Sequence, residues 1–311
     1  MKRIRRLDDV TGADRGASAA IGNFDGVHLG HRQVLEAARA ASGAPLAVLT
    51  FEPHPREVFR PHDPPFRLMD PEARAHRLER LGVDLLFELD FGLIRPMPHD
   101  VFSAKVLAGG IGLSHVTVGA DFRYGRDRGG TLATLTAEGA AHGFGVTVAD
   151  LLAVDAHGDR ISSTAIRAAL SEGRPRDAAA MLGHWHRIEG EVLHGDKRGR
   201  ELGYPTANVG LGKLHRPRFG VYAVLVDVLD GPNAGSHAGV ASLGVRPQFG
   251  ENAPNLEVHL FDFAGDLYGA VISVALVAFL RAEARFDSVE ELVAQMAEDC
   301  AQARDVLTST R

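Results

Sequence analysis

Residues 19–41 read AAIGNFDGVHLGHRQVLEAARAA, which predicts a short apolar strand, a glycine-rich turn and an alanine-rich helix in that order. Gly22, Gly26 and Gly30 let the backbone turn sharply and approach a ligand closely. The helix that follows offers unpaired backbone N–H groups and the positive end of its dipole, both favourable for phosphate. The three elements together predict an α/β domain with a phosphate-binding loop at its first turn.

The same alternation continues to about residue 152. Apolar runs typical of strands lie at 46–51, 83–89, 115–118 and 146–152, and helical patterns lie between them at 72–81, 101–107 and 131–142. Strands separated by helices at this spacing predict a parallel sheet with both faces covered.

The pattern changes after Leu182. Runs rich in β-forming residues follow at 188–193, 221–229, 238–243, 256–261 and 271–279, separated by Gly and Pro. They predict a small antiparallel barrel or sandwich. Ser288 and Glu291 have the spacing of a capping box, and apolar residues recur at helical spacing up to Cys300, which predicts a closing helix docked on the barrel. We therefore expect two domains, 1–184 and 185–311.

Length and composition limit the function classes. A chain of 311 residues corresponds to about two domains. Lys and Arg number 34 against 40 Asp and Glu, so there is no global basic field and nucleic acid is not an expected partner. The single cysteine, Cys300, excludes an intrachain disulfide and a Cys-rich metal site. The most apolar segment, 270–280, is far shorter than the about 20 residues of a membrane span, so we expect a cytoplasmic protein without a membrane partner.

His28 and His31 follow the glycine-rich turn and are the candidate catalytic residues of the first domain. Imidazole N–H groups placed there donate to phosphoryl oxygens whose charge grows during displacement. Without this context, the pair would be read as surface or capping residues, or as half of a metal site. The His-x-Gly-His spacing resembles the nucleotidylyltransferase superfamily, which implies a Rossmann-like domain whose histidines steady the α-phosphate of ATP.

Three further segments follow strands or begin a helix: 51–57 (FEPHPRE), 119–125 (GADFRYG) and 161–167 (ISSTAIR). The first two lie at predicted carboxyl ends of strands, where α/β proteins bind ligands. The third offers hydroxyls, a helix N-terminus and an arginine suited to polyphosphate, although a plain helix cap is the alternative reading.

All four segments together resemble the prokaryotic bifunctional riboflavin kinase/FAD synthetase family, and the resemblance covers the chain almost end to end. It implies that the first domain adenylylates FMN to FAD. The implied nucleotide-binding residues are Gly22, Asn23, Phe24, Asp25, Gly26, Gly30, Ser163, Thr164 and Arg167. The implied flavin-binding residues are His54, Pro55 and Asp121. Thr131 departs from the acidic or amide residue expected there.

The second domain has a different candidate phosphate site. Residues 190–208 read GEVLHGDKRGRELGYPTAN, and neither a Walker-type loop nor a His-Arg-Asp kinase loop is present in the sequence. Glycines and basic residues such as Gly195 and Arg200 predict an anion-binding loop, and Thr206 and Asn208 offer oxygen ligands for Mg²⁺. The last four residues alone would be read as a turn. The whole stretch resembles the flavokinase motif, which implies that Thr206 and Asn208 hold ATP–Mg²⁺.

Glu257 and His259 alternate along a predicted strand and therefore share one face. Such a face either meets solvent or lines a site. The family resemblance implies that Glu257 is the general base that accepts the proton of the ribityl 5′-hydroxyl. It also implies that Arg281 lies on the flavin side. Ser242 and Gln248 stand where the family usually has Asn and Thr. Both substitutes still form hydrogen bonds, so we expect altered flavin affinity or loop geometry rather than an inactive kinase.

The sequence thus predicts a bifunctional enzyme of flavin cofactor synthesis. Its expected ligands are riboflavin, FMN, FAD, ATP and Mg²⁺, and we expect a monomer or a weak homo-oligomer. Three alternatives stay open at this stage: an FAD synthetase whose barrel only binds flavin, a flavin-sensing regulator without activity, and an adenylyltransferase for another phosphorylated substrate.

Overall fold

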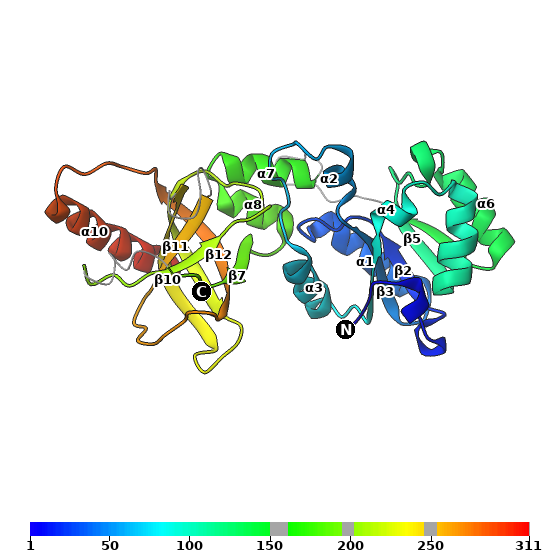
Figure 1. Cartoon of the computed structure of the whole chain (residues 1–311), viewed down its shortest axis with the longest axis horizontal. Helices are drawn as coiled ribbons and strands as arrows, with labels where there is room; N and C mark the ends of the chain where they lie inside the picture. The colour runs from blue at the N-terminus through cyan, green and yellow to red at the C-terminus, as the bar shows by residue number, and fades with distance from the viewer. Residues whose placement is uncertain (150–160, 195–201, 246–253, 311) are drawn as a thin grey trace. The chain divides into compact units, whose positions relative to one another are not determined.

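A computed structural model describes residues 1–149, 161–194, 202–245 and 254–310. The chain forms two compact units (Figure 1). The first unit comprises Met1–Asp63 and Pro71–Ile161, and the second comprises Pro64–Asp70 and Ser162–Arg311. Helices α7 (Ser163–Ser171) and α8 (Pro175–Leu182) belong to the second unit, and the functional boundary at 184/185 stays a prediction.

The first unit is built on a parallel sheet in the order β1-β4-β3-β2-β5-β6. Its strands are β1 (Lys2–Ile4), β2 (Ser18–Ile21), β3 (Leu46–Glu52), β4 (Leu85–Asp90), β5 (His115–Gly119) and β6 (Gly145–Ala149). The chain runs outward from β2 through β3 to β4 and then returns to β5 on the other side of β2. The topological switch point therefore lies between β2 and β5, where open α/β sheets bind ligands.

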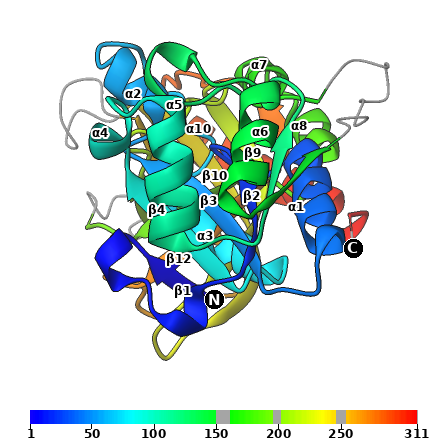
Figure 2. The same ribbon diagram turned by 90° about the vertical axis from the view of Figure 1, so that its right-hand side faces the viewer.

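Helices cover both faces of this sheet, as predicted. The helices of this unit are α1 (Leu29–Ala41), α2 (Pro55–Phe59), α3 (Pro71–Arg80), α4 (Phe91–Ile94), α5 (His99–Val101), the π-helix η3 (Phe102–Ile111) and α6 (Leu132–His142), with 3-10 turns at Leu7–Asp9, Gly12–Asp14 and Arg126–Arg128. Figure 2 shows η3 and α6 in front of the strands. Ala19 and Ile21 pack with Phe102 and Leu107 of η3 in one buried cluster. Ser18 points to the opposite face, where its hydroxyl donates to the Ala38 carbonyl of α1 at 2.6 Å.

The second unit contains an antiparallel sheet in the order β7-β12-β9-β10-β11-β8. The strands are β7 (Arg187–Glu191), β8 (Ala207–Gly210), β9 (Gly220–Val228), β10 (Gly235–Val245), β11 (Pro254–Leu260) and β12 (Val271–Arg281). Leu193, just after β7, donates its backbone N–H to the Asn208 carbonyl of β8 at 2.9 Å and brings the two ends of the sheet together. This near-barrel agrees with the predicted fold class, whereas the short edge strands β1 and β8 were not predicted.

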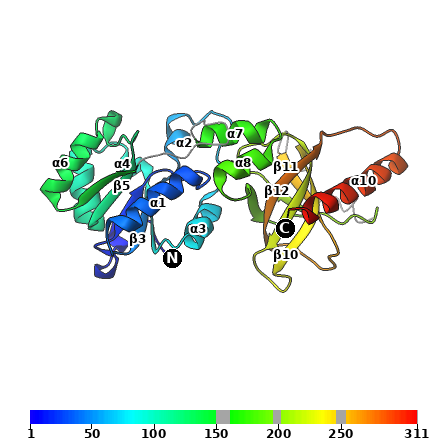
Figure 3. The same ribbon diagram turned by 180° about the vertical axis from the view of Figure 1, so that it is seen from behind.

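The closing helix α10 (Val289–Thr308) lies against β9, β10 and β12 (Figure 3). The Ser288 hydroxyl accepts from the Glu291 N–H, as predicted, but the Glu291 carboxylate accepts from the N–H of Asp287 rather than from that of Ser288. The helix docks mainly through its C-terminal half, where Ala303 and Leu307 are buried. Val289 fits the apolar helical spacing that runs to Cys300, and the sequence therefore predicts it on the docked face, but it is exposed in the first turn of α10.

Candidate active sites

The loops of the first candidate site leave the carboxyl ends of neighbouring parallel strands. The glycine-rich turn follows β2, Pro53 and His54 follow β3, and Asp121 follows β5. Parallel pairing places these ends along one edge of the sheet, at or beside the switch point. The topology thus brings together three of the four segments of the first domain.

The turn after β2 holds a strained backbone. Phe24 and Val27 have φ angles of 52° and 42°, in the region that favours glycine, and both side chains are buried. Each such residue costs about 1–3 kcal/mol and persists only where its surroundings dictate its conformation. The Gly22 N–H donates to the Leu49 carbonyl at 3.1 Å, and the Thr50 hydroxyl donates to the Asn23 carbonyl at 3.3 Å.

His28 and His31 stack on each other at the start of α1. Their ring centroids lie 3.7 Å apart with an interplanar angle of 18°, and Phe24 lies 5.0 Å from the His31 ring. His28 is the N-cap residue, and its Nδ1 accepts from the His31 N–H at 3.3 Å. Burial, and to a smaller extent the neighbouring His28, holds the pKa of His31 well below its usual value, so its ring is neutral at pH 7.

Gly30 explains the spacing of the two histidines. A Cβ at this position would lie 3.2 Å from two atoms of the His28 ring, which is tighter than an ordinary contact. A side chain there would therefore push His28 away from His31. Gly30 lies in the first turn of α1 with ordinary helical backbone, so packing against His28, and not the sharp backbone turn expected at this glycine, accounts for it.

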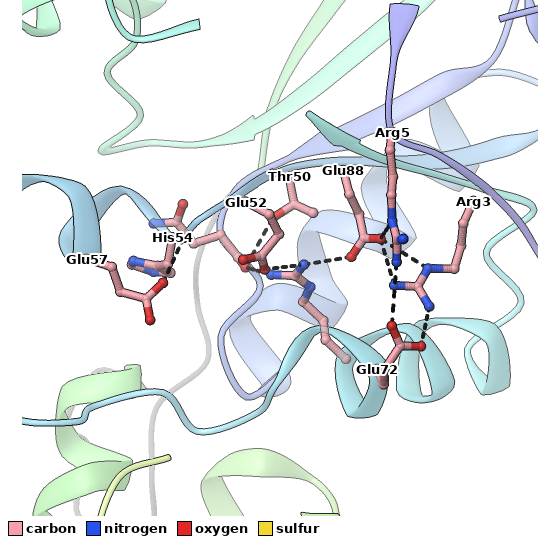
Figure 4. A network of polar contacts seen from close by, with 10 residues as sticks. Arg3, Arg5, Thr50, Glu52, His54, Glu57, Glu72 and Glu88 are labelled. Carbon is pink, nitrogen blue, oxygen red and sulfur yellow. Dashed lines mark hydrogen bonds and ion pairs between the residues drawn. The ribbon is translucent and has the colours of Figure 1, made fainter. Parts of the chain in front are cut away.

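His54 begins helix α2 and sits at the end of the network in Figure 4. Its Nδ1 accepts from the Arg56 N–H at 3.0 Å, and the Glu57 carboxylate accepts from the His54 N–H at 3.1 Å. This reciprocal pair is a capping box, with Pro55 at the first helical position. The predicted flavin-binding role of His54 and Pro55 stays a prediction.

The loop after β5 is anchored by a residue that the sequence analysis did not single out, Glu138 of α6. The Tyr124 hydroxyl donates to Glu138 Oε2 at 2.6 Å, and His99 Nδ1 lies 2.6 Å from Oε1. Burial and the Glu138 hydrogen bond raise the pKa of Tyr124 to about 12. Phe122 stacks on Tyr124 with centroids 5.5 Å apart, so the aromatic loop beside Asp121 is held at its base. The sequence predicts that Glu138 lies on a helix, but no sequence pattern indicates its contacts with Tyr124 and His99.

The third segment opens α7, in the second unit. Ser162 caps the helix by accepting from the Ala165 N–H at 3.2 Å, one residue before the two hydroxyls predicted to bind nucleotide, Ser163 and Thr164. Arg167 Nε donates to the Phe66 carbonyl at 2.6 Å, and its guanidinium lies 5.4 Å from the Phe66 ring. Arg167 therefore binds α7 to the segment Pro64–Asp70.

The second candidate site lies on the barrel face shared by β8, β10 and β11. Asn208 pairs directly with Glu257, which pairs on its other side with Ser242, so the three side chains share that face. Asn255, which no sequence pattern indicated, donates from Nδ2 to Asn208 Oδ1 at 2.8 Å, and both residues are buried. His259 Nδ1 lies 2.9 Å from the Pro205 carbonyl, beside Thr206. The predicted sites Gly195 and Arg200, and the departure at Gln248, lie outside the described residues.

The Arg281 side chain forms an ion pair and is not an unpaired charge on the barrel surface. Its Nε and Nη2 donate to the two carboxylate oxygens of Asp299 at 2.8 and 2.7 Å, and Nη1 donates to the Ala282 carbonyl at 3.0 Å. Asp299 is buried on α10. Arg281 therefore fastens α10 to β12, and its flavin-side role stays a prediction.

Comparison with known proteins gives matches along both units. Two family models match in succession, FAD synthetase over residues 11–165 and riboflavin kinase over residues 182–307. The bifunctional riboflavin kinase/FMN adenylyltransferase of Pseudomonas fluorescens is 42% identical over 309 residues, covering 98% of this chain and 97% of its own. The protein of the same name from Haemophilus influenzae is 38% identical over 313 residues, covering 99% and 100%.

A solved structure matches over the same length. The crystal structure described as a macrolide-efflux protein from Streptococcus pneumoniae has a TM-score of 0.79 at 30% identity and covers 96% of each chain. Among the helices of the described residues, none is long and apolar enough to cross a membrane.

Proposed function

This chain belongs to the bifunctional riboflavin kinase/FMN adenylyltransferase family, and on that premise we infer that it converts riboflavin to FMN and FMN to FAD. The observation that carries this inference is the full-length similarity to curated enzymes that unite both activities. We assign the adenylyl transfer to residues 1–184 and the kinase reaction to residues 185–311. Each reaction consumes one ATP.

In the adenylyl transfer, a phosphate oxygen of FMN attacks the α-phosphorus of ATP, the bond between the α- and β-phosphates breaks, and pyrophosphate leaves. Negative charge grows on the oxygens around the α-phosphorus, and His28 and His31 are placed to donate hydrogen bonds to them. Support comes from their stacking at the N-terminus of α1, where unpaired N–H groups also favour phosphate. The nucleotide contacts of the loop Gly22–Gly26, of Gly30, and of Ser163, Thr164 and Arg167 belong to the same proposal.

In the kinase reaction, the ribityl 5′-hydroxyl attacks the γ-phosphorus of ATP, ADP leaves, and Glu257 accepts the hydroxyl proton. Glu257 is partly exposed on a strand face next to Asn208, so it can meet both substrate and solvent. Positioning and charge stabilisation account for catalysis of this kind.

The residues of the second site fit Mg²⁺ delivered with a nucleotide. Thr206 and Asn208 offer oxygen atoms, which Mg²⁺ prefers, and few protein ligands are needed because phosphates and water complete its shell. The described residues hold no group of three or more acidic, histidine or cysteine side chains that would make a separate metal site. When bound, the ion would supply positive charge that offsets the charge on the transferring phosphate. Asn255 Nδ2 donates to Asn208 Oδ1 and fixes the Asn208 amide, and the second lone pair of that oxygen would be the one available to the ion.

The remaining assignments complete the proposal. His54, Pro55 and Asp121 contact the flavin of FMN in the first domain, and Arg281 lies on the flavin side of the second. The protein works in the cytoplasm as a monomer or a weak homo-oligomer and has no nucleic-acid or membrane partner.

The test is a time course with purified protein, riboflavin, ATP and Mg²⁺, analysed by chromatography. FMN that appears first and then gives way to FAD is the expected result. FAD formed from added FMN but no product from riboflavin would make the barrel a binding domain. If folded protein converts neither flavin, the proposed enzymatic activity is refuted, and the alternative of a flavin-sensing regulator is favoured.

A further inference from the structure

A buried arginine outside all the predicted motifs contacts two of them. Arg74 lies on α3, and its side chain is 3% exposed. Its Nη2 lies 2.7 Å from Glu52 Oε1 and 2.9 Å from Glu88 Oε1, and its Nη1 donates to the Asn23 carbonyl at 3.4 Å. A charge at this depth is stable only when it is paired. Nη1 and Nη2 of Arg74 have these partners, whereas its Nε has none among the described residues.

The contact with Asn23 bears on the nucleotide loop. The Asn23 carbonyl immediately precedes Phe24, the first residue of the turn with a positive φ, and it accepts from both Arg74 and Thr50. A turn with two such residues needs neighbours that hold its backbone in place. Arg74 and Thr50 both hold the Asn23 carbonyl, five residues before His28.

The contact with Glu52 bears on the second motif. Glu52 is the last residue of β3 and lies two residues before His54. One guanidinium therefore joins the loop after β2 to the loop after β3. These are the loops that the proposed function assigns to ATP and to FMN.

The third partner of Arg74, Glu88, links it to a second group of charged side chains. Glu88 Oε2 accepts from Arg3 Nε at 3.0 Å and from Arg3 Nη2 at 2.8 Å. Arg5 and Glu72 complete the outer end, and Figure 4 shows Glu88 between this outer group and Glu52. Arg3, Arg5 and Arg74 thus face Glu52, Glu72 and Glu88, three charges of each sign.

We propose that Arg74 is a positioning residue for the adenylyl transfer, which sets the nucleotide loop and the flavin-side loop at the separation the reaction needs. The proposal rests on the proposed function of the first domain. Arg74 does not touch the reacting atoms. It acts through Asn23 and Glu52, so its loss should slow the chemical step more than it weakens substrate binding.

The experiment compares four variants of the full chain: Arg74→Met, Arg74→Lys, Arg3→Met and the double variant Arg74→Met/Glu88→Met. Arg3→Met is the matched control, because it removes a partner of Glu88 but keeps the contacts of Arg74 with Asn23 and Glu52. The double variant replaces the buried pair with apolar side chains, a change that is often neutral or stabilising. Rates of FAD formation from FMN, rates of FMN formation from riboflavin, and Tm are measured for each.

We expect Arg74→Met to lower kcat for FAD formation about 30-fold with KM values for ATP and FMN within about threefold of wild type. Arg74→Lys should recover part of that loss, and Arg3→Met should lower Tm while keeping kcat. The double variant should regain Tm but stay slow, with its kinase rate unchanged. Recovery of kcat together with Tm, or equal losses in Arg3→Met and Arg74→Met, would overturn the positioning role. Absence of FAD formation by the wild-type protein would instead refute the proposed function.

Discussion

Acidification should destabilise the second unit through one buried histidine. His186 is 1% exposed, and its Nε2 has no hydrogen-bond partner among the described residues. Burial, and to a smaller extent His215 and His184, lowers the pKa of His186 to about 3. The folded protein therefore keeps this ring neutral at pH values where the unfolded chain, with a pKa of about 6.5, protonates it.

The size of the effect follows from that difference. Between pH 6.5 and pH 3 the unfolded state binds more protons than the folded state, so the free energy of unfolding falls as the pH falls. The contribution of His186 is fully present above pH 6.5. It should decrease by about 2 kcal/mol between pH 7.5 and pH 5, and by about 5 kcal/mol once the pH is below 3.

Urea unfolding followed by tryptophan fluorescence measures this directly, because Trp185 is the single tryptophan of the chain and belongs to the second unit. The assay compares wild type with His186→Leu at pH 7.5 and pH 5. The wild type should lose about 2 kcal/mol more than the variant over this range. Ile188→Val is the control, since it removes one buried methyl group and should cost about 1 kcal/mol at both pH values. Equal pH dependence of wild type and His186→Leu would refute the reasoning.

The two active sites and the helix contact give three further predictions. His28→Ala should abolish FAD formation from FMN and leave riboflavin phosphorylation intact, and loss of both activities in folded protein would contradict the assignment. Glu257→Gln should stop FMN formation while added FMN is still converted to FAD, and an unchanged kinase rate would exclude Glu257 as the base. Asp299→Ala should leave Arg281 without its buried partner and lower the free energy of unfolding by about 2–3 kcal/mol in the same fluorescence assay, whereas a change below about 0.5 kcal/mol would mean that the pair does not hold α10.

Local patterns predicted the helices and strands well wherever burial imposes a regular period. The runs at 46–51 and 271–279 correspond to β3 and β12, because a strand covered on both faces is apolar at nearly every position. The short strand β1 was missed because Lys2 and Arg3 are charged, and their partners Asp14 and Glu88 are distant in sequence. Val289 was predicted to be buried because helical spacing shows which residues share a face. It does not show how much of that face packs against the barrel.

The glycine-rich turn after β2 and the histidine pair at the start of α1 were predicted from the sequence alone, since both involve residues close together in the chain. The tightest contacts that a side chain at Gly30 would make are with His28, two residues away in the chain. The supporting contacts could not be read in this way. Arg74 reaches Asn23 across 51 residues, and Asn255 reaches Asn208 across 47. Such partners share no local pattern, because a buried polar group is satisfied by whichever residue the packed fold brings within hydrogen-bond distance.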